Sequence, residues 1–280
     1  MQESSIRFIN FIMTINRNRL LACVFLGIFV ATGGAQEPVV EEKKAEEVPA
    51  YVIKFGNLPQ EKREAYGGHK LKAEQFFRQK RTFESLDEIH QALLIFDEDP
   101  GMWNLMGSCH VEFRSFEKAS EAFRRALALN EKNTGILFNL AEMDFVTKNW
   151  KGCIEKMATL NELFEENSDG ELSDSVLQIH RLALFKRMLA HLKLGEEKKA
   201  RQLAEDSWED FDDTPFTYYS KAALSYFEGE EEEAVSWLRS AARVFGGLAV
   251  ANWQDTLIEF GYVRSFYGGD EGGEIELSDE

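Results

Sequence analysis

Small residues recur every 34 residues along this chain, and this interval constrains the fold more than any other feature of the sequence. Ala119 is preceded by Ser85 and followed by Cys153 at this interval, and Ala200 and Ala234 resume it after one interruption. A fixed period of this length indicates one supersecondary unit repeated in tandem. We therefore expect five units, beginning near Tyr66, Pro100, Thr134, Arg181 and Pro215.

Three more positions follow the same interval. The register of Gly107 contains Ala73, Ala141, Met188 and Ala222; that of Ala126 contains Ala92, Leu160, Ser207 and Ala241; that of Phe123 contains Ile89, Met157, Ala204 and Leu238. In the best-formed unit, residues 100–133, the small residues let two helices approach closely around Trp103 and Phe123. Such a hairpin cannot bury both faces alone, so it requires neighbouring repeats.

This unit resembles a tetratricopeptide repeat (TPR). The resemblance is carried by Trp103, Met106 and Gly107 on the first helix and by Phe116, Ala119, Phe123 and Ala126 on the second. It covers residues 66–248 and implies an all-α fold: a right-handed superhelical array of about five TPR-like helix hairpins with a C-terminal capping helix, residues 251–262. The presence of only five prolines and the lack of alternating β-branched runs also favour helix.

The expected helix boundaries follow from turn and capping residues. The Gly67-Gly68 pair should start the first helix, and residues 82–96 should form its partner. The polar segment 165–174 should be a loop, followed by helices over residues 175–194 and 196–211. Gly195 and Gly229 should form the turns of the last two units.

Outside the repeats, we expect an N-terminal targeting segment, residues 1–35. Arg17 and Arg19 precede an apolar run, residues 20–31, and small residues end at Ala35, which is typical of an export signal. Either a cleaved signal peptide or a retained membrane anchor fits this pattern, and translation from either Met1 or Met13 retains it. Residues 36–60 should be a flexible acidic spacer, 61–262 the TPR-like domain, and 263–280 a disordered acidic tail. The protein is thus expected to be of an exported bacterial type, periplasmic or envelope-associated.

The charge of the chain bears on its partners. The formal net charge is -17, which argues against a nucleic-acid partner because phosphate binding requires clustered Lys and Arg. A protein or peptide partner that is basic or apolar fits better. Contact with a membrane is expected only through the N-terminal segment.

Catalytic and metal-binding patterns are lacking in the sequence. No two of the five histidines have the three- or four-residue spacing that chelates a metal on one helix face. We therefore expect no metal, no cofactor and no enzymatic activity. Cys109 and Cys153 either form a disulfide or remain two separate buried thiols.

The TPR resemblance implies that the first helices line a concave groove that binds a peptide or a helix of a partner. The positions it assigns to this groove are Phe77, Asn104, Ser108, Phe138, Glu142, Phe145, Phe185, Tyr219 and Tyr226. The expected function is a protein-interaction scaffold in the cell envelope. The alternative is a structural component of an envelope assembly, which packs through repeat edges without a discrete ligand.

Overall fold

The computed structural model of the chain describes residues 48–168, 172–208 and 213–263. These residues form α-helices and no strand, which confirms the predicted all-α class. They divide into two compact units, residues 48–143 and residues 144–263. The expected targeting segment, residues 36–47 of the expected spacer and residues 264–280 of the expected tail lie outside the described residues.

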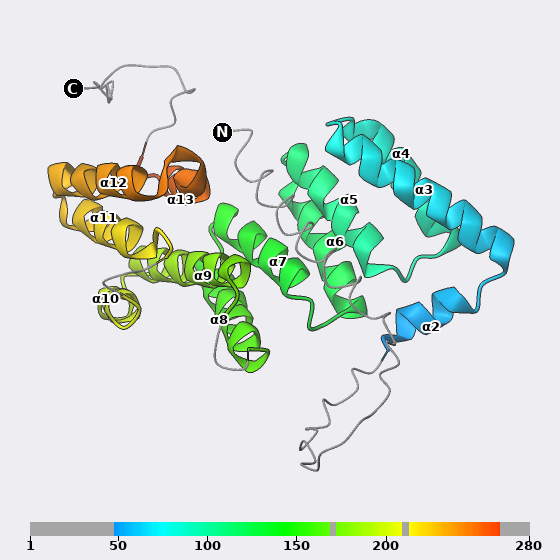
Figure 1. The fold of residues 1–280 in the computed structure, drawn as a ribbon, viewed down its shortest axis with the longest axis horizontal. Helices are drawn as coiled ribbons and strands as arrows, with labels where there is room; N and C mark the ends of the chain where they lie inside the picture. Colours follow the sequence, from blue (N-terminus) through cyan, green and yellow to red (C-terminus); the bar gives the residue numbers. More distant parts are fainter. Residues whose placement is uncertain (1–47, 169–171, 209–212, 264–280) are drawn as a thin grey trace, which may run out of the picture. The chain divides into compact units, whose positions relative to one another are not determined.

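The first unit contains two helix hairpins preceded by a short helix (Figure 1). In chain order the helices are α2 (Ala50–Gly56), α3 (Gln60–Arg78), α4 (Thr82–Ile95), α5 (Pro100–Glu112), α6 (Phe116–Leu129) and the first part of α7 (Thr134–Val146). The α3–α4 and α5–α6 pairs are the first two predicted repeats. Their shared core joins α3, α4, α5 and α6 through side chains such as Phe77, Ile89, Leu105 and Ala122.

The second unit contains the end of α7 and the remaining helices. These are α8 (Trp150–Glu166), α9 (Asp174–Lys193), α10 (Glu197–Glu205), α11 (Phe216–Glu228), α12 (Glu231–Phe245) and α13 (Gly247–Phe260). The helix α9 packs against α8, α10, α11 and α13, so it forms the centre of this unit. The α9–α10 and α11–α12 pairs correspond to the fourth and fifth predicted repeats.

Every hairpin turns in the same way. One residue in each turn has a positive φ: Lys80, Arg114, Lys148, Gly195 and Gly229, with φ between 55° and 84°. The amide of the following residue then donates to the carbonyl five residues earlier, over 2.8 to 2.9 Å in all five turns. This is the Schellman ending of a helix. The left-handed residues follow the same 34-residue interval as the small residues, which supports the predicted repeat register.

The small-residue register is fully buried. Ser85, Ala119, Cys153, Ala200 and Ala234 all have 0% exposed surface. The close helix approach is clearest at Gly107, where an added Cβ would lie 2.4 Å from Cε1 of Phe123. The interval therefore exists because helix pairs must touch at these positions.

Several boundaries differ from the sequence-based expectations. The spacer prediction ended at residue 60, but α2 is helical because Phe55 packs against Tyr66 and Phe96, with ring centroids 5.1 and 5.4 Å away. The helix α3 begins before Gly67-Gly68 and runs through them, because the buried Tyr66 anchors its first half. At the other end of the chain, α10 ends at Glu205, before the expected residue 211, and α13 begins at Gly247, before the expected residue 251.

Candidate interaction surface

The last helix of the described residues, α13, does more than cap the α11–α12 hairpin. Its buried residues, Val250, Trp253, Thr256, Leu257 and Phe260, recur at helical spacing and therefore lie on one side of the helix. The ring of Trp253 lies against side chains of two first helices: Phe185 of α9 at 5.5 Å, and Tyr219 and Phe216 of α11 at 5.8 and 6.4 Å between ring centroids. The hydroxyl of Tyr219 also donates to the carbonyl of Val250 over 3.5 Å.

The C-terminal end of α13 contacts the end of α7 and the start of α8. The ring of Phe260 stacks on Phe145 with centroids 6.3 Å apart and meets Trp150 edge-on at 6.0 Å. Just after the helix, Tyr262 stacks on Tyr226 of α11 at 5.4 Å. Aromatic side chains of α7, α8, α9 and α11 therefore hold the aromatic residues of the C-terminal helix.

Two lysines of α9 add positive charge to this contact. Nζ of Lys186 lies 3.5 Å from Oε2 of Glu259, on α13, and 4.2 Å from the centre of the Phe145 ring. Lys186 has only 2% of its surface exposed, which is rare for a lysine and requires compensating partners. Nζ of Lys193 lies 4.3 Å above the ring of Phe260. We call Phe185, Lys186, Lys193, Phe216 and Tyr219 the docking face.

This geometry corrects the predicted groove in the second unit. Phe145, Phe185 and Tyr219 were expected to be exposed to a partner, but they are 1%, 0% and 2% exposed because α13 packs on them. Tyr226 is half-buried under Tyr262. These residues do lie on first helices, as the repeat pattern predicted. The pattern did not predict that α13 covers them. Periodicity relates the residues within each hairpin, but it does not predict which other helix packs on that hairpin.

The predicted groove residues of the first unit are also mostly buried. Phe77 belongs to the core beneath α4 and α5, and Ser108 donates from Oγ to the carbonyl of Asn104 over 3.0 Å within its own helix. Phe138 is 1% exposed. These three side chains were predicted to line the groove, but they are buried within the protein. Asn104 and Glu142 are half-buried.

Asn104 has a partner that the sequence analysis missed. Nδ2 of the buried Asn139, on α7, donates to Oδ1 of Asn104 over 2.9 Å. Oδ1 of Asn139 has no hydrogen-bond partner within the described part of the chain. The spacing of 35 residues, one more than the repeat, is the only sequence signal that relates these two amides. A pair of amides at this position can bind the backbone of a peptide, since each offers both a donor and an acceptor.

A second polar cluster fixes the start of α5. The Asp99 carboxylate accepts from the amide of Gly101 over 2.7 Å, from Nζ of Lys70 over 2.7 Å, and from the hydroxyl of Tyr66. Burial by itself raises the pKa of Asp99, but the charge and hydrogen bond of Lys70 and the other donors outweigh it and hold this pKa below its ordinary value. Burial next to this carboxylate raises the pKa of Tyr66. The cluster joins α3 to the second hairpin.

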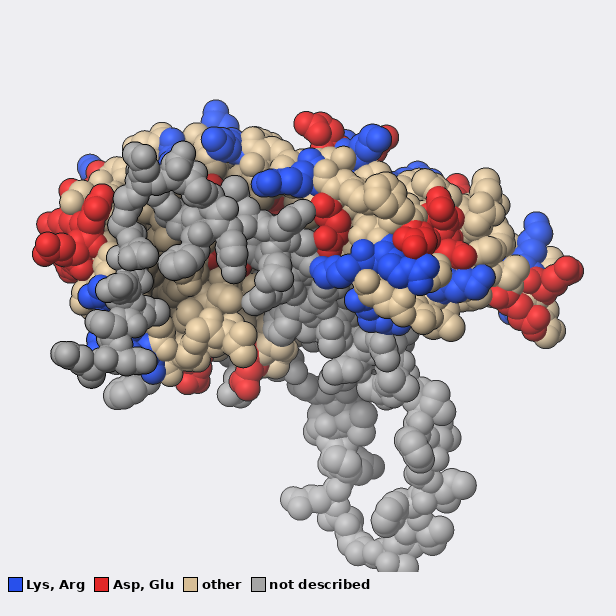
Figure 2. Space-filling view, turned by 90° about the horizontal axis from the view of Figure 1, so that it is seen from above, with Lys and Arg blue, Asp and Glu red and all other residues tan. Residues whose placement is uncertain are grey.

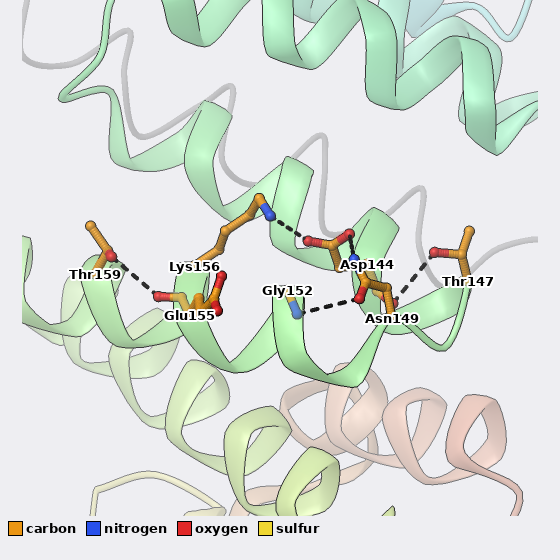
Figure 3. A network of polar contacts seen from close by, with 7 residues as sticks. All are labelled: Asp144, Thr147, Asn149, Gly152, Glu155, Lys156 and Thr159. Atoms are coloured by element: carbon orange, nitrogen blue, oxygen red, sulfur yellow. Dashed lines mark hydrogen bonds and ion pairs between the residues drawn. The ribbon is translucent and has the colours of Figure 1, made fainter. Parts of the chain in front are cut away.

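The turn between α7 and α8 is held by the polar network in Figure 3. Lys156, on α8, reaches back so that its Nζ lies 2.6 Å from Oδ2 of Asp144, and Nδ2 of Asn149 donates to Oδ1 of Asp144 over 2.9 Å. Asn149 also caps α8, because its Oδ1 accepts from the amide of Gly152 over 3.4 Å. These contacts all lie at one helix junction and stabilise the hairpin.

Three further titratable side chains, those of His180, Cys109 and Cys153, are buried. Nε2 of His180 lies 3.2 Å from Oε1 of Glu165, and burial lowers the pKa of this histidine in spite of the carboxylate. Cys109 and Cys153 are both buried and do not form a disulfide, which favours the second of the two cysteine alternatives. Burial raises the pKa of Cys109 to about 12, so its thiol is not an activated nucleophile. Within residues 48–168, 172–208 and 213–263, no group of His, Cys, Asp and Glu side chains could hold a metal ion.

None of the helices in the described segments is both long enough and apolar enough to cross a membrane.

Comparisons with known proteins give distant similarities. No protein-family profile matches the chain. Transcription factor tau subunit sfc4 of Schizosaccharomyces pombe is 26% identical over 121 residues, which are 42% of this chain and 11% of that protein. The chain thus matches only a small part of that relative's length.

Two similar solved structures are those of pilF from Pseudomonas aeruginosa and BtubC (BKLC) from P. vanneervenii. The first has a TM-score of 0.37 at 15% identity, covering 70% of this chain and 99% of that chain. The second has a TM-score of 0.43 at 14% identity, covering 82% and 99%. At these identities, neither an activity nor a partner follows for this chain.

Proposed function

We propose that this chain is a non-enzymatic protein-interaction scaffold of TPR-like helix hairpins, which binds a peptide or a helix of a partner protein on the side formed by its first helices. The observation that carries the proposal is that the docking face already holds a helix, α13, by aromatic anchors and an ion pair. A surface that accommodates one amphipathic helix has the shape and chemistry that helix-in-groove recognition uses.

The first unit supplies a second, more polar surface. Asn104 and Glu142 are half-buried on first helices, and Asn104 is paired with Asn139. Figure 2 shows that basic and acidic side chains are interspersed on the face drawn there. The whole chain carries a net charge of -17, and on this ground we propose a basic or apolar segment as the partner. Residues 48–143 contribute little to that charge, because they contain 14 acidic and 13 basic side chains.

Site-specific substitution tests this binding surface. The full-length protein is used to capture partners from an envelope extract, with Asn104→Ala, on the first helix α5, compared with Glu121→Ala, on the exposed side of α6. We expect Asn104→Ala to weaken capture of the main partner at least tenfold and Glu121→Ala to leave it unchanged. Equal capture by both variants, with unchanged thermal midpoints, would place the binding surface elsewhere.

A salt titration of the same capture identifies the partner's chemistry. Binding of a basic segment should weaken steadily as NaCl is raised from roughly 0.05 to roughly 0.5 M, because salt screens the attraction between opposite charges. Binding of an apolar segment should change little or strengthen.

We also propose that the scaffold works in the cell envelope after export. The support for this is the sequence of residues 1–35, with Arg17 and Arg19 before an apolar run. N-terminal sequencing of the protein from an envelope fraction should find a chain that starts near Gln36, or an intact N-terminus if the segment is retained as an anchor. An intact chain in the cytoplasm would contradict export.

A structural component that packs through repeat edges is the second candidate. It is favoured by two strongly exposed apolar side chains, Leu94 on α4 at 80% and Leu248 on α13 at 88%. Leu94→Gln should then prevent the protein from entering the envelope assembly, whereas Asn104→Ala should not. If both results are observed, this second function replaces the first.

A further inference from the structure

The link before α13 differs from the other helix connections of the second unit. A single residue, Gly246, separates α12 from α13, and its φ of 78° and ψ of 157° are accessible essentially to glycine alone. The helix then begins at Gly247. A Cβ added at either glycine would have nothing within 4 Å. No side chain or backbone of the rest of the unit therefore packs closely against the Cβ positions of this link. The backbone of Gly246 is held only by contacts with the two helices that it joins, since its amide donates to the carbonyl of Ala242 over 2.9 Å and its carbonyl accepts from the amide of Val250 over 3.4 Å.

The contact between α13 and the docking face is also complementary in charge. The docking face contributes Lys186 and Lys193, whereas α13 carries Asp255 and Glu259 and no basic residue. Although the whole chain has an excess of acidic residues, these two lysines lie where the acidic helix α13 packs. The docking face thus selects a helix that is aromatic on one side and acidic beside its last aromatic residue.

We propose that the docking face is a helix-binding site whose resident ligand is α13, and that a partner helix of the same chemistry displaces α13. Such a helix presents a Trp, a Leu and a Phe at the spacing of Trp253, Leu257 and Phe260, with a carboxylate at the position of Glu259. The inference rests on the proposed scaffold function and names the partner class for the second unit: an acidic amphipathic helix. While bound, α13 keeps the face closed to other ligands.

Hydrogen exchange on the full-length wild-type protein tests the displacement. The probe is a synthetic peptide with the sequence of residues 247–262, added at up to about 1 mM because a tethered segment competes at an effective concentration of that order. We expect the amides of α13 to exchange faster when the peptide is present, while the amides of α9 and α11 stay protected. If the exchange of α13 does not change at any peptide concentration, the proposal is wrong.

Variant peptides show whether the contacts seen in the structure carry the binding. Peptides with Trp253→Ala or Glu259→Gln should lose at least tenfold in affinity, because they lack the central anchor or the carboxylate that pairs with Lys186. The matched control is Gln254→Ala, at an exposed position of α13. Equal affinities of all four peptides would show nonspecific binding and overturn the proposed partner class.

A variant of the protein tests the role of α13 as a competitor. In full-length Phe260→Ala, α13 is held more weakly, so the labelled wild-type peptide should bind at least tenfold more tightly than to the wild-type protein. The variant's cooperative melting and helical circular dichroism establish that it is folded. If the Phe260→Ala protein does not fold, the hydrogen-exchange experiment on the wild-type protein decides whether the peptide displaces α13.

Two further outcomes are distinguishable. If light scattering shows that Phe260→Ala forms a dimer that the peptide dissociates, the resident helix exchanges between two copies, and a second copy replaces the partner helix in the proposal. If the peptide never binds but Asn104→Ala still abolishes capture, the scaffold function stands and only the helix-binding site is refuted.

Discussion

At the scale of single residues, the fold depends on positions where helices touch without room for a side chain. Gly107 is the clearest case, because its missing Cβ would lie 2.4 to 2.8 Å from three atoms of the Phe123 ring. That ring is 0% exposed and cannot move aside. Ala119 is equally buried in the same hairpin, as its place in the repeat predicted.

We expect Gly107→Ala to lower the free energy of unfolding by about 1 to 3 kcal/mol, which is typical of an overpacked core. Gly68→Ala is the matched control, since Gly68 is also helical but an added Cβ there meets nothing within 4 Å. This control should stabilise the protein by about 0.5 to 1 kcal/mol through helix propensity. Urea denaturation measures both, and a stabilised Gly107→Ala protein would contradict the close helix contact.

The left-handed turn residues lead to a second prediction. Arg114 has a φ of 55°, which costs a residue with a side chain about 1 to 2 kcal/mol, whereas the equivalent Gly229 avoids this cost. Arg114→Gly should therefore stabilise the protein by about 0.5 to 1 kcal/mol after the greater freedom of glycine in the unfolded chain is subtracted. Gly229→Ala should have the opposite sign. Thermal melts of the two variants that shift in the same direction would refute this explanation.

At the scale of elements, the Asp99 cluster joins α3 to α5 and gives stability that depends on pH. The pKa of Asp99 is lower in the folded protein than its ordinary value of about 3.9. The carboxylate therefore contributes its full stabilisation above about pH 4, and this is lost as the pH falls through the lower folded pKa.

Asp99→Asn should reduce the free energy of unfolding at pH 7 by about 1.5 to 3 kcal/mol, the range for hydrogen bonds to a charged group. The difference between wild type and variant should shrink as the pH falls below about 4, because the carboxylate is protonated first in the unfolded chain and, at lower pH, also in the folded protein. Asp97→Asn is the control, because Asp97 is exposed on the same turn. Urea titrations at pH 7 and pH 3 decide; a difference that does not depend on pH would show that the charge of Asp99 is not responsible.

The elements also show what the sequence could and could not predict. The 34-residue interval predicted the hairpins and their buried positions, because contacts within and between adjacent helices are local. The candidate site was predicted only in part. The register placed Phe145, Phe185, Tyr219 and Tyr226 on first helices, but their covering by Trp253, Phe260 and Tyr262 is a contact between distant segments, which periodicity does not encode. The Gly67-Gly68 error has the same origin, since the burial of Tyr66 overrides local propensity.

At the scale of the whole molecule, the excess of acidic residues should oppose folding. With 49 acidic and 32 basic side chains, the folded chain concentrates like charges that the unfolded chain can separate. The run of glutamates at the start of α12 shows this locally. A hydrogen bond and repulsion between Glu230 and Glu233 raise the pKa of Glu230. Surface ion pairs such as Arg201 with Glu197, at 2.8 Å, act in the opposite direction, but exposed pairs contribute at most about 1 kcal/mol each and often nothing.

Salt should therefore stabilise this protein, because screening relieves the repulsion more than it weakens the exposed ion pairs. We expect the melting midpoint at pH 7 to rise by about 2 to 4 °C between roughly 20 and 300 mM NaCl, equivalent to about 1 kcal/mol for a chain of this size. Glu230→Gln removes one member of the repelling group, so it should melt higher than wild type at low salt and gain less from added salt. A midpoint that falls as NaCl is added would mean that the ion pairs outweigh the repulsion, and the effect of Glu230→Gln at low salt would then reverse.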